Sequence, residues 1–469
     1  MDDAGRGFDL SAVLATRREV TLLTDAVHDL LYTFQHPADE HDAPRVLPCA
    51  ELSLDCSDTY PVYKIRVTDD TTGDSTELVV RRPFAGDSSL FGRGTRAYLA
   101  YDLKARKLVV LKDTWRAKDR RQRAESAILR ELHANDVPFI PQVLYGGDVP
   151  GSNDAPQHTV VDELSAEQAQ RRCTDTPLLG HIHHRMVQDI FYPLQTVRNE
   201  RELIQALHDT IITLDIAHQK LGILHRDLSY QNIMLDSQGR CVVNDWDSAG
   251  PFTPDGGAVG TVHFMSIRLL RNESLPNEPV DDLQSLFWVL SFAALLCFAQ
   301  YHGGIRSGLF DDRNAREGGD PSSVSTAKVF SLRDGSLYRG RYCCAALTAL
   351  VAELADAWAE YQRVLFAPKG ACIPALELKP EMLELAARPS YWLEKFAAAL
   401  AKYDADEREA RIADQLEDLA ASREDLAEAA AAGGKRKAGD SDVPVAGAQG
   451  EGPQLARRSK RLRAIRQRQ

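Results

Sequence analysis

Three side chains near the middle of the sequence have the types and the spacing that phosphoryl transfer requires. Asp227 follows a His-Arg pair, Asn232 comes five residues later, and Asp245 comes 13 residues after Asn232. A carboxylate at the first position can orient an acceptor hydroxyl, and an amide followed by a second carboxylate can hold the magnesium that bridges ATP phosphates. Each residue is common by itself, but the joint spacing is specific. The segment 223–247 therefore predicts a site for this chemistry.

The first half of the chain supplies the complementary groups. Gly92 and Gly94 lie in a G-x-G-x-x-A turn, whose backbone N–H groups can approach phosphate oxygens closely. Lys112 ends a Val-Val-Leu-Lys strand and can neutralise the α- and β-phosphates. Glu125 opens an apolar helical pattern and can orient that lysine, whereas Glu131 falls on the more polar face. Taken alone, the glycines also fit a hairpin turn and the lysine an exposed position, but all these groups occur in the required order.

The predicted site follows from these assignments, with Asp227 as the base that orients the hydroxyl. The predicted catalytic residues are Asp227, Lys112 and Asn232. The predicted ATP-binding residues are Gly92, Gly94, Lys112, Glu125, Met234 (below the adenine) and Asp245, and the predicted magnesium ligands are Asn232 and Asp245. We expect His225 to be a packed scaffold residue, Arg226 to pair with a phosphate on the following segment, and Asp282 to bind the backbone of the catalytic loop.

Apolar spacing indicates which elements position these residues. Strand patterns occupy 60–82, 90–102, 108–112 and 185–189, and a helix begins at Glu125. Helical patterns then cover 200–220, ending at Gly222, and 281–300, 343–366 and 390–403. A β-rich half followed by a helical half, with the motif at their junction, predicts an α+β fold of two lobes around one cleft.

We expect five regions along the chain. They are an N-terminal helical extension over 1–50 (helical spacing over 9–34), a β-rich lobe over 51–195 with an insertion loop at about 150–180, a helical lobe over 196–403, a charged helix over 404–432, and a disordered basic tail over 433–469. A cluster of histidines at His181, His183 and His184 fits a strand surface better than a metal site, because further ligands with defined geometry are lacking.

Composition points to an intracellular chain without a membrane span. The eight cysteines show no CxxC or Cys/His ligand spacing, which is typical of reduced thiols. The longest apolar stretch, 286–299, is shorter than the ~20 residues that a bilayer requires, so we expect a buried core helix. The N-terminus lacks the basic and apolar regions of a signal peptide.

The charge of the chain is unevenly distributed. Residues 435–469 hold ten Lys and Arg against three Asp and Glu, although the whole chain has a net charge of −12. The clusters 435–437 and 457–463 resemble a bipartite nuclear import signal, which predicts an import receptor as partner and nuclear localisation; without such import the chain would be cytoplasmic. Nucleic-acid binding is disfavoured because no aromatic residue is interleaved with the basic ones.

Several segments together resemble the fungal-type protein kinase family, within the eukaryotic protein-kinase-like superfamily, over about 60–403. They are Gly92-Arg-Gly-Thr, Lys112-Asp-Thr-Trp, His184-Arg-Met-Val, Leu224-His-Arg-Asp-Leu-Ser, Gln231-Asn-Ile-Met, Asp245-Trp-Asp and the tail Arg457-Arg-Ser-Lys-Arg-Leu-Arg. The resemblance implies a two-lobed kinase fold, ATP and Mg²⁺ as cofactors, a protein substrate, and transfer to Ser or Thr.

Three positions depart from the usual pattern of protein kinases. Asp247 replaces the Gly of Asp-Phe-Gly, Ser229 stands where Ser/Thr kinases carry Lys, and Ser266-Ile-Arg replaces Ala-Pro-Glu, whose Glu normally forms an ion pair. These departures keep open the alternative of a pseudokinase that acts as a nucleotide-binding scaffold. A small-molecule kinase is a further alternative, because such enzymes share the spacing of Asp227, Asn232 and Asp245, but they would usually show His-Gly-Asp instead of His-Arg-Asp.

Overall fold

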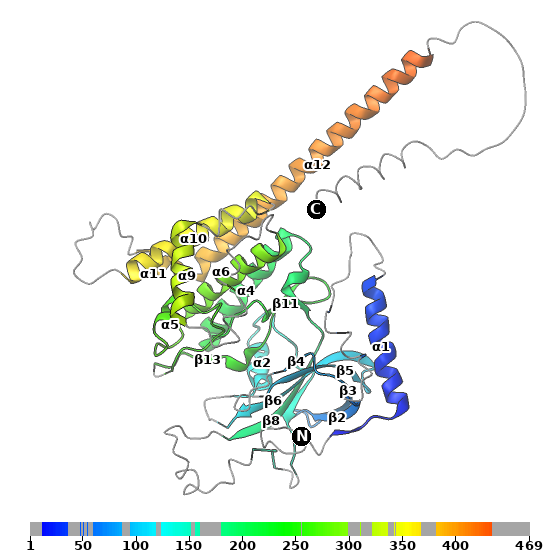
Figure 1. Cartoon of the computed structure of the whole chain (residues 1–469), viewed down its shortest axis with the longest axis vertical. Coiled ribbons are helices and arrows are strands. Elements are labelled where there is room, and N and C mark those ends of the chain that lie inside the picture. Colours follow the sequence, from blue (N-terminus) through cyan, green and yellow to red (C-terminus); the bar gives the residue numbers. More distant parts are fainter. Residues whose placement is uncertain are drawn as a thin grey trace, which may run out of the picture. The chain divides into compact units, whose positions relative to one another are not determined.

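The computed structural model of the protein describes most of the chain. The described residues are 12–35, 47, 50, 54, 60–86, 94–118, 123–151, 155–159, 180–254, 256–298, 310, 321–335, 342, 344–366 and 381–433. They fall into two compact units, one through Ala405 and one from Asp406 onward. The first unit holds a β-rich N-lobe, up to residue 188, and a mainly helical C-lobe (Figure 1). The predicted α+β class and two-lobed fold are confirmed.

An antiparallel sheet of eight strands forms the N-lobe. The strands are β1 (Ala12–Leu14), β2 (Tyr63–Thr68), β3 (Ser75–Val80), β4 (Ala85–Gly86), β5 (Arg96–Asp102), β6 (Lys107–Ala117), β7 (Tyr145–Asp148) and β8 (His181–Gln188). Their order is β1-β2-β3-β5-β6-β8-β7, with β4 paired to β5. β6 and β8 are longer than the sequence pattern predicted, because polar residues at their outer ends still pair across the ladder, Ala117 opposite His181.

The sheet curls so that β2 approaches β7, two strands that do not pair. The Asp70 N–H donates to the Gly146 carbonyl (3.0 Å). A side chain at Gly147 would meet the Thr68 carbonyl at 2.4 Å, so only glycine permits this approach. The curl encloses a core of alternate strand residues: Ile65, Val67, Leu78, Val80, Ala100, Val109, Leu111 and Val187. This core keeps β6, the strand of Lys112, in a fixed position.

The N-terminal extension is part of the N-lobe. A helix was predicted over 9–34, but residues Ala12–Leu14 pair with β2, and the helix α1 runs from Arg17 to Gln35. It starts there because the Glu19 carboxylate accepts from the Thr16 N–H (2.7 Å) and hydroxyl. Leu23 and Val27 of α1 are buried in one cluster with sheet residues such as Leu99.

The C-lobe is built from helices around the catalytic segment. They are α4 (Glu200–Leu221), α5 (Ile267–Arg271), α6 (Pro279–Cys297), α9 (Pro321–Asp334), α10 (Ala345–Leu365), α11 (Glu381–Ala386) and α12 (Pro389–Gly433). As predicted, α4 ends at Gly222, whose φ of 65° suits glycine. Its start is capped by Asn199, which accepts from the Glu202 N–H (2.9 Å).

Short strands carry the catalytic segment between these helices. β11 (Ile233–Leu235) pairs with β12 (Cys241–Val243) and with β9 (Tyr192–Pro193), and β10 (Ile223–Leu224) pairs with β13 (Gly250–Pro251). A 3-10 turn, η3 (Leu194–Thr196), follows β9, and a second, η4 (Trp246–Ser248), follows β12. The segment between Leu224 and Gly250 is therefore held at both ends.

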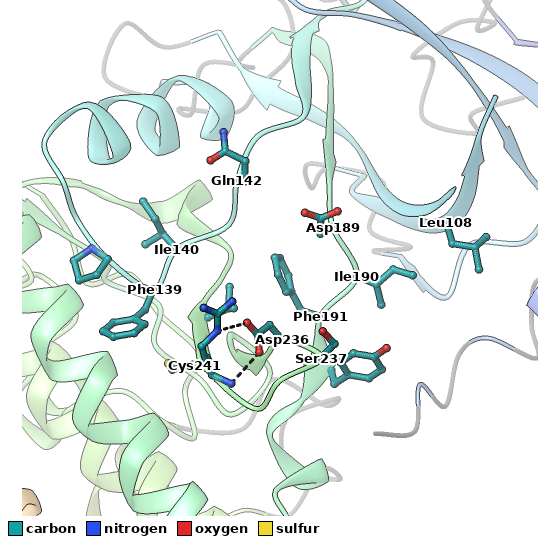
Figure 2. A pocket seen from close by; sticks show the side chains of 14 residues that line it. Leu108, Phe139, Ile140, Gln142, Asp189, Ile190, Phe191, Asp236, Ser237 and Cys241 are labelled. Carbon is teal, nitrogen blue, oxygen red and sulfur yellow. Dashed lines mark hydrogen bonds and ion pairs between the residues drawn. The ribbon is translucent and has the colours of Figure 1, made fainter. Parts of the chain in front are cut away.

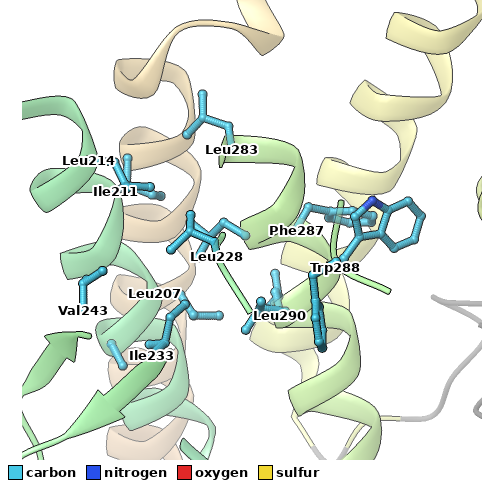
Figure 3. Packing of buried hydrophobic residues seen from close by; sticks show 14 of the residues in the cluster. Leu207, Ile211, Leu214, Leu228, Ile233, Val243, Leu283, Phe287, Trp288 and Leu290 are labelled. Atoms are coloured by element: carbon cyan, nitrogen blue, oxygen red, sulfur yellow. The ribbon is translucent and has the colours of Figure 1, made fainter. Parts of the chain in front are cut away.

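The helix α6 is the centre of the C-lobe core. It is long and apolar enough to cross a membrane, but 83% of its most apolar window is buried inside the protein. Figure 3 shows Phe287, Trp288 and Leu290 of α6 beside Leu207 and Ile211 of α4. The predicted buried core helix is thus present, and the catalytic segment packs against it.

The C-terminal helical patterns form one element. Two helices were predicted, over 390–403 and 404–432, but α12 runs without interruption from Pro389 to Gly433. No Gly or Pro interrupts the sequence between these ends, and alanine favours the helix throughout. Residues through Ala405 belong to the first compact unit, and the remainder lies in the second.

Two predicted regions lie largely outside the described residues. Of the insertion loop at about 150–180, the structure describes residues 150–151, 155–159 and 180, and Pro156 bridges to Pro150 and His158 to Ile182. The basic tail over 434–469 is not among the described residues.

Substitution of Leu23 by Ala tests the role of α1. The side chain is 1% exposed in the cluster that α1 shares with the sheet, so its loss should cost about 2–5 kcal/mol in the free energy of unfolding. Leu14→Ala is the control, because Leu14 is 70% exposed and should change stability by less than about 0.5 kcal/mol. Urea unfolding measures both. Equal losses of unfolding free energy in Leu23→Ala and Leu14→Ala would show that α1 is not part of the folded lobe.

Candidate active site

A single ammonium group stands at the centre of the site. Lys112 Nζ on β6 lies 2.6 Å from Glu125 Oε2, 2.6 Å from Asp245 Oδ1 and 2.8 Å from Asp247 Oδ2. Glu125 is the first residue of α2 (Glu125–Ala134), and the two aspartates flank Trp246 after β12. The structure thus brings together three groups predicted to act on ATP, namely Lys112, Glu125 and Asp245, and adds Asp247 to them.

Local geometry explains why the three carboxylates converge. Asp245 has left-handed backbone angles (φ 61°, ψ 64°), which turn the chain sharply before η4 and bring Asp247 back to the same lysine. Trp246 between them is completely buried, and its indole N–H donates to the Val243 carbonyl (2.8 Å). Its backbone N–H donates to Glu125 Oε1 (2.9 Å), which ties this turn directly to α2.

The charges of the cluster shift the pKa of its members. Burial alone would lower the pKa of Lys112, but Asp245, Asp247 and Glu125 outweigh it and hold that pKa well above the ordinary value. Burial raises the pKa of Glu125, and the two aspartates raise it further, against the opposing effect of Lys112. Lys112 therefore stays protonated, and the site carries more negative than positive charge.

The catalytic loop brings Asp227 and Asn232 together. Asn232 donates from Nδ2 to the Asp227 carbonyl (2.8 Å), and its own carbonyl accepts from the Asn244 N–H (2.8 Å), next to Asp245. Asp227 Oδ1 accepts a hydrogen bond from the Thr261 hydroxyl (2.7 Å). The first contact orients the amide so that Oδ1 of Asn232 is the atom that could ligate a cation.

A buried carboxylate fixes the backbone of this loop, as predicted. Asp282, in the first turn of α6, accepts from the N–H groups of His225 and Arg226 (both 2.9 Å). Burial raises the pKa of Asp282 to about 7, although these two hydrogen bonds oppose the shift. His225 accepts at Nδ1 from the Asp227 N–H (3.3 Å) and lies 3.0 Å at Nε2 from the Asn244 carbonyl, so it is a scaffold residue.

Arg226 contacts the segment that follows Asp245. Its Nε donates to the Ser248 carbonyl (2.6 Å). A side chain at Gly250 would meet the guanidinium at 2.7 Å, so glycine leaves the space that the arginine fills. The predicted pairing of Arg226 with a phosphate stays a prediction.

The Glu of Ala-Pro-Glu normally forms an ion pair, and this chain lacks that Glu. An ion pair is nevertheless present at its position. Arg268, at the position of that Glu, pairs with Asp281 on α6 and lies 3.3 Å from Glu278. The charges are reversed, since the arginine is on the segment and the carboxylates are on the helix. Ser266 donates to Asp281 as well (2.6 Å), and Nζ of the buried Lys328 donates to the Met265 carbonyl (2.6 Å). The segment 265–268 is thus fixed without the usual residue.

His183 and His184 of β8 are buried, whereas His181 is half-buried, and this corrects the prediction of a strand-surface cluster. His183 pairs with Asp113 and stacks on Trp115 with ring centroids 4.5 Å apart. His184 lies with Nε2 3.0 Å from the Ser126 hydroxyl on α2 and with Nδ1 2.8 Å from Asp148. The surface position was predicted wrongly because both faces of β8 are covered in the folded protein.

These contacts of β8 help to hold α2, and with it Glu125. Ser126 follows Glu125 directly and is completely buried, so the serine is inaccessible to any substrate and its contact is structural. Further along α2, Arg130 pairs with Asp69 and Asp70 in the turn after β2. Contacts at the start and in the middle of α2 therefore fix the distance between Glu125 and Lys112.

The remaining predicted residues have different outcomes. Gly92 lies outside the described residues. Gly94 lies two residues before β5 and has a φ of 55°, which suits the predicted glycine turn. Met234 is half-buried on β11, and its sulfur accepts from Asn244 Nδ2 (3.4 Å).

The donor set fits a hard divalent cation. Carboxylate oxygens of Glu125, Asp245 and Asp247 lie within 4.8 Å of one another. Oxygen ligands of this kind are those that Mg²⁺ prefers. Asn232 could add an amide oxygen from the catalytic loop.

The connection between the lobes borders a separate cavity. It has a volume of about 690 Å³ and is lined by residues such as Leu108, Phe139, Ile190 and the ion pair of Asp236 and Arg240 (Figure 2). None of the lining residues belongs to the Lys112 cluster or the catalytic loop. The cavity is therefore distinct from the candidate site.

Comparison with known proteins identifies the family of this arrangement. The family model described as fungal protein kinase matches residues 50–294, slightly more than half of the chain. The chain belongs to the fungal protein kinase family. The matched range contains every residue of the Lys112 cluster and of the catalytic loop, so the family assignment and the site rest on the same part of the chain.

Curated relatives resemble a smaller part of this fungal protein kinase. One is the probable serine/threonine-protein kinase PknB of Bifidobacterium longum (strain NCC 2705), 27% identical over 119 residues, which cover 24% of this chain and 17% of that protein. Another is ribosomal protein S6 kinase alpha-4 of Mus musculus, 26% identical over 132 residues, 27% of this chain and 16% of that protein. The chain thus spans less than a fifth of the length of either relative.

Sequence reasoning missed three participants of the site. Asp247 was recognised as a charged residue in place of a glycine but not as a partner of Lys112, although its place two residues after Asp245 could have suggested a shared partner. Thr261 had no sequence signal that linked it to Asp227, 34 residues away. His184 was visible only as part of a histidine cluster, because its contact with Ser126 spans 58 residues.

Replacement of Asp148 by Asn tests the contacts that hold α2. Burial alone would raise the pKa of Asp148, but hydrogen bonds from His184 and Arg116 outweigh it and lower the pKa from 3.8 to about 2. Ionised Asp148 therefore stabilises the fold above about pH 4, and this contribution is lost as the pH falls toward 2. Because Asp148 is partly exposed, we expect Asp148→Asn to cost about 1 kcal/mol at pH 7 and less at pH 2.5.

Urea unfolding at both pH values measures this difference. Asp189→Asn is the control, since Asp189 forms an exposed ion pair with Lys107 and should matter little at either pH. A cost of Asp148→Asn that is the same at pH 7 and pH 2.5 would contradict the assigned contacts.

Proposed function

We propose that this fungal protein kinase transfers the γ-phosphate of Mg-ATP to a protein hydroxyl, at serine or threonine. The observation that carries the proposal is the convergence of Glu125 and Asp245 on Lys112, each at 2.6 Å, across the two lobes. Phosphoryl transfer in protein kinases depends on this lysine–glutamate pair and on the metal-binding aspartate being in place together.

Each residue has a distinct task in the proposed reaction. Lys112, oriented by Glu125, binds the α- and β-phosphates. Asn232 and Asp245 would hold the magnesium ion, which would neutralise negative charge on the phosphates. Asp227 orients the acceptor hydroxyl and accepts its proton, as the hydroxyl oxygen bonds to the γ-phosphorus and the bond from that phosphorus to ADP breaks.

Transfer to serine or threonine is supported by two observations. The Thr261 hydroxyl donates to Asp227 (2.7 Å), so an aliphatic hydroxyl fits against the proposed base, although Ser229 stands in place of the usual lysine. The name of the relative from Bifidobacterium longum describes a serine/threonine-protein kinase. Tyrosine transfer has no comparable support.

A nucleotide-binding scaffold without turnover is the second candidate. The observation that favours it is Asp247, whose carboxylate lies 2.8 Å from Lys112 and would compete with phosphate for the ammonium. The chemical groups of the first candidate are nevertheless all in place, apart from Gly92, which the structure does not describe.

Asp227→Asn tests the proposed reaction. The amide cannot accept the hydroxyl proton, so transfer from labelled ATP to casein, and to the protein itself, should fall by about 10²–10⁴-fold. Mg-ATP should still raise the melting temperature of the variant, because Asp227 is not proposed to bind the nucleotide. Phosphoamino-acid analysis of the wild-type product should give phosphoserine or phosphothreonine.

Other outcomes separate the alternatives. Phosphate transfer by Asp227→Asn at the wild-type rate would show that Asp227 is not the base that accepts the hydroxyl proton. A wild-type protein that binds Mg-ATP but transfers no phosphate would be the nucleotide-binding scaffold. Transfer to small alcohols but not to proteins would indicate a small-molecule kinase.

We also propose that the basic tail binds a nuclear import receptor. The clusters 435–437 and 457–463 support this from sequence alone. Replacement of their Lys and Arg residues by Ala should abolish nuclear accumulation of a fluorescent fusion in eukaryotic cells. Replacement of the acidic residues of the tail is the control. Equal nuclear signal of the wild type and the alanine variant would contradict the proposal.

A further inference from the structure

The Lys112 cluster holds one carboxylate more than the proposed reaction uses. Glu125 binds the lysine and the Trp246 N–H, and Asp245 binds the lysine as a prospective metal ligand. Asp247 also binds the lysine (2.8 Å), and its side chain is only 11% exposed. Asp245 and Asp247 by themselves exceed the charge of the ammonium by one negative charge, and Glu125 adds a second where it is ionised.

This excess acts on the phosphates of an entering nucleotide. The nucleotide must place its phosphates near Lys112, where Asp247 already lies within hydrogen-bonding distance of the ammonium. Like charges a few ångströms apart repel strongly in a partly buried site, where screening by water and salt is weak. A nucleotide without a divalent cation would therefore meet the charge of Asp247 with only the ammonium of Lys112, shared among the carboxylates, to offset it.

A divalent cation reverses the effect of the same carboxylate. Asp245 is 33% exposed and Asp247 is 11% exposed, whereas Glu125 is 3% exposed and committed to Lys112 and Trp246. The two aspartates are thus the carboxylates that a cation on the phosphates would approach. Their charges would attract this cation and offset the repulsion of the phosphates.

We propose that Asp247 is a specificity-determining residue that makes nucleotide binding depend on the divalent cation. The carboxylate excludes metal-free ATP from Lys112 and accepts the magnesium complex. The inference rests on the proposed function, since it concerns the same nucleotide site. It assigns a role to the position at which the chain departs from the Gly of Asp-Phe-Gly.

Asp247→Asn tests the inference, because the amide keeps the size of the side chain and removes its charge. Binding of ATP to the full chain is measured by calorimetry in excess Mg²⁺ and in EDTA. In the wild type we expect affinity to be about 100-fold or more higher with Mg²⁺. In the variant this ratio should shrink about tenfold, which is about 1.4 kcal/mol, mainly because binding in EDTA becomes tighter.

Two further variants sharpen the comparison. Asp404→Asn removes the charge of an exposed ion pair with Arg201 in the C-lobe and should leave the ratio of affinities unchanged. If Asp247→Asn does not fold, Asp247→Gly, the residue usual at this position, should show the same reduced ratio. Circular dichroism establishes folding of each variant.

The result also separates the inference from the proposed function. An unchanged ratio in a folded Asp247 variant, together with tight Mg-ATP binding by the wild type, would overturn the inference alone. A wild type that binds no ATP with Mg²⁺ would overturn both.

Discussion

The ammonium of Lys112 draws together three parts of the chain that are far apart in the sequence. β6 carries the lysine, α2 carries Glu125, and the turn after β12 carries Asp245 and Asp247. The carboxylates of this cluster could not lie so close together without a shared cation, because their mutual repulsion in a buried site would be large. The ammonium of Lys112 therefore determines how closely the two lobes approach each other at the site.

The rest of the structure keeps the participants of the cluster in place. The curled sheet fixes β6, and α2 is held to the sheet by Ser126 at one end and by Arg130 farther along. In the C-lobe, Asp282 on the buried α6 binds the backbone of the catalytic loop at two N–H groups. The apolar cores thus position a small number of polar contacts, and these position the chemistry.

Two of the three departures from the usual kinase pattern place a charged side chain in an ionic contact. The ion pair of Arg268 and Asp281 fixes the segment 265–268 with reversed charges, so the interaction is retained although the residue types are exchanged. Asp247 adds a contact to Lys112 where a glycine would add none. Neither change removes a group that the proposed reaction requires, which favours an active kinase over a scaffold.

The sequence by itself determined the class of fold, the order of the lobes and the chemistry of Lys112, Glu125, Asp227, Asn232 and Asp245. These depend on spacing along one strand, one helix or one loop, and local periodicity records such spacing directly. The fold and family were confirmed, while the roles of the site residues remain to be measured. The start of α1 at Arg17 and the continuity of α12 were not recognised, because capping and the absence of a helix breaker are weaker signals than an apolar pattern.

Only the tertiary structure decided which side chains share a partner. The burial of His183 and His184, the contact of Thr261 with Asp227, and the approach of Asp247 to Lys112 join residues separated by between 34 and 135 positions. Such contacts depend on how the curled sheet, α2 and the turn after β12 come together. No periodicity along the chain encodes them, because each arises from burial and charge balance between distant segments.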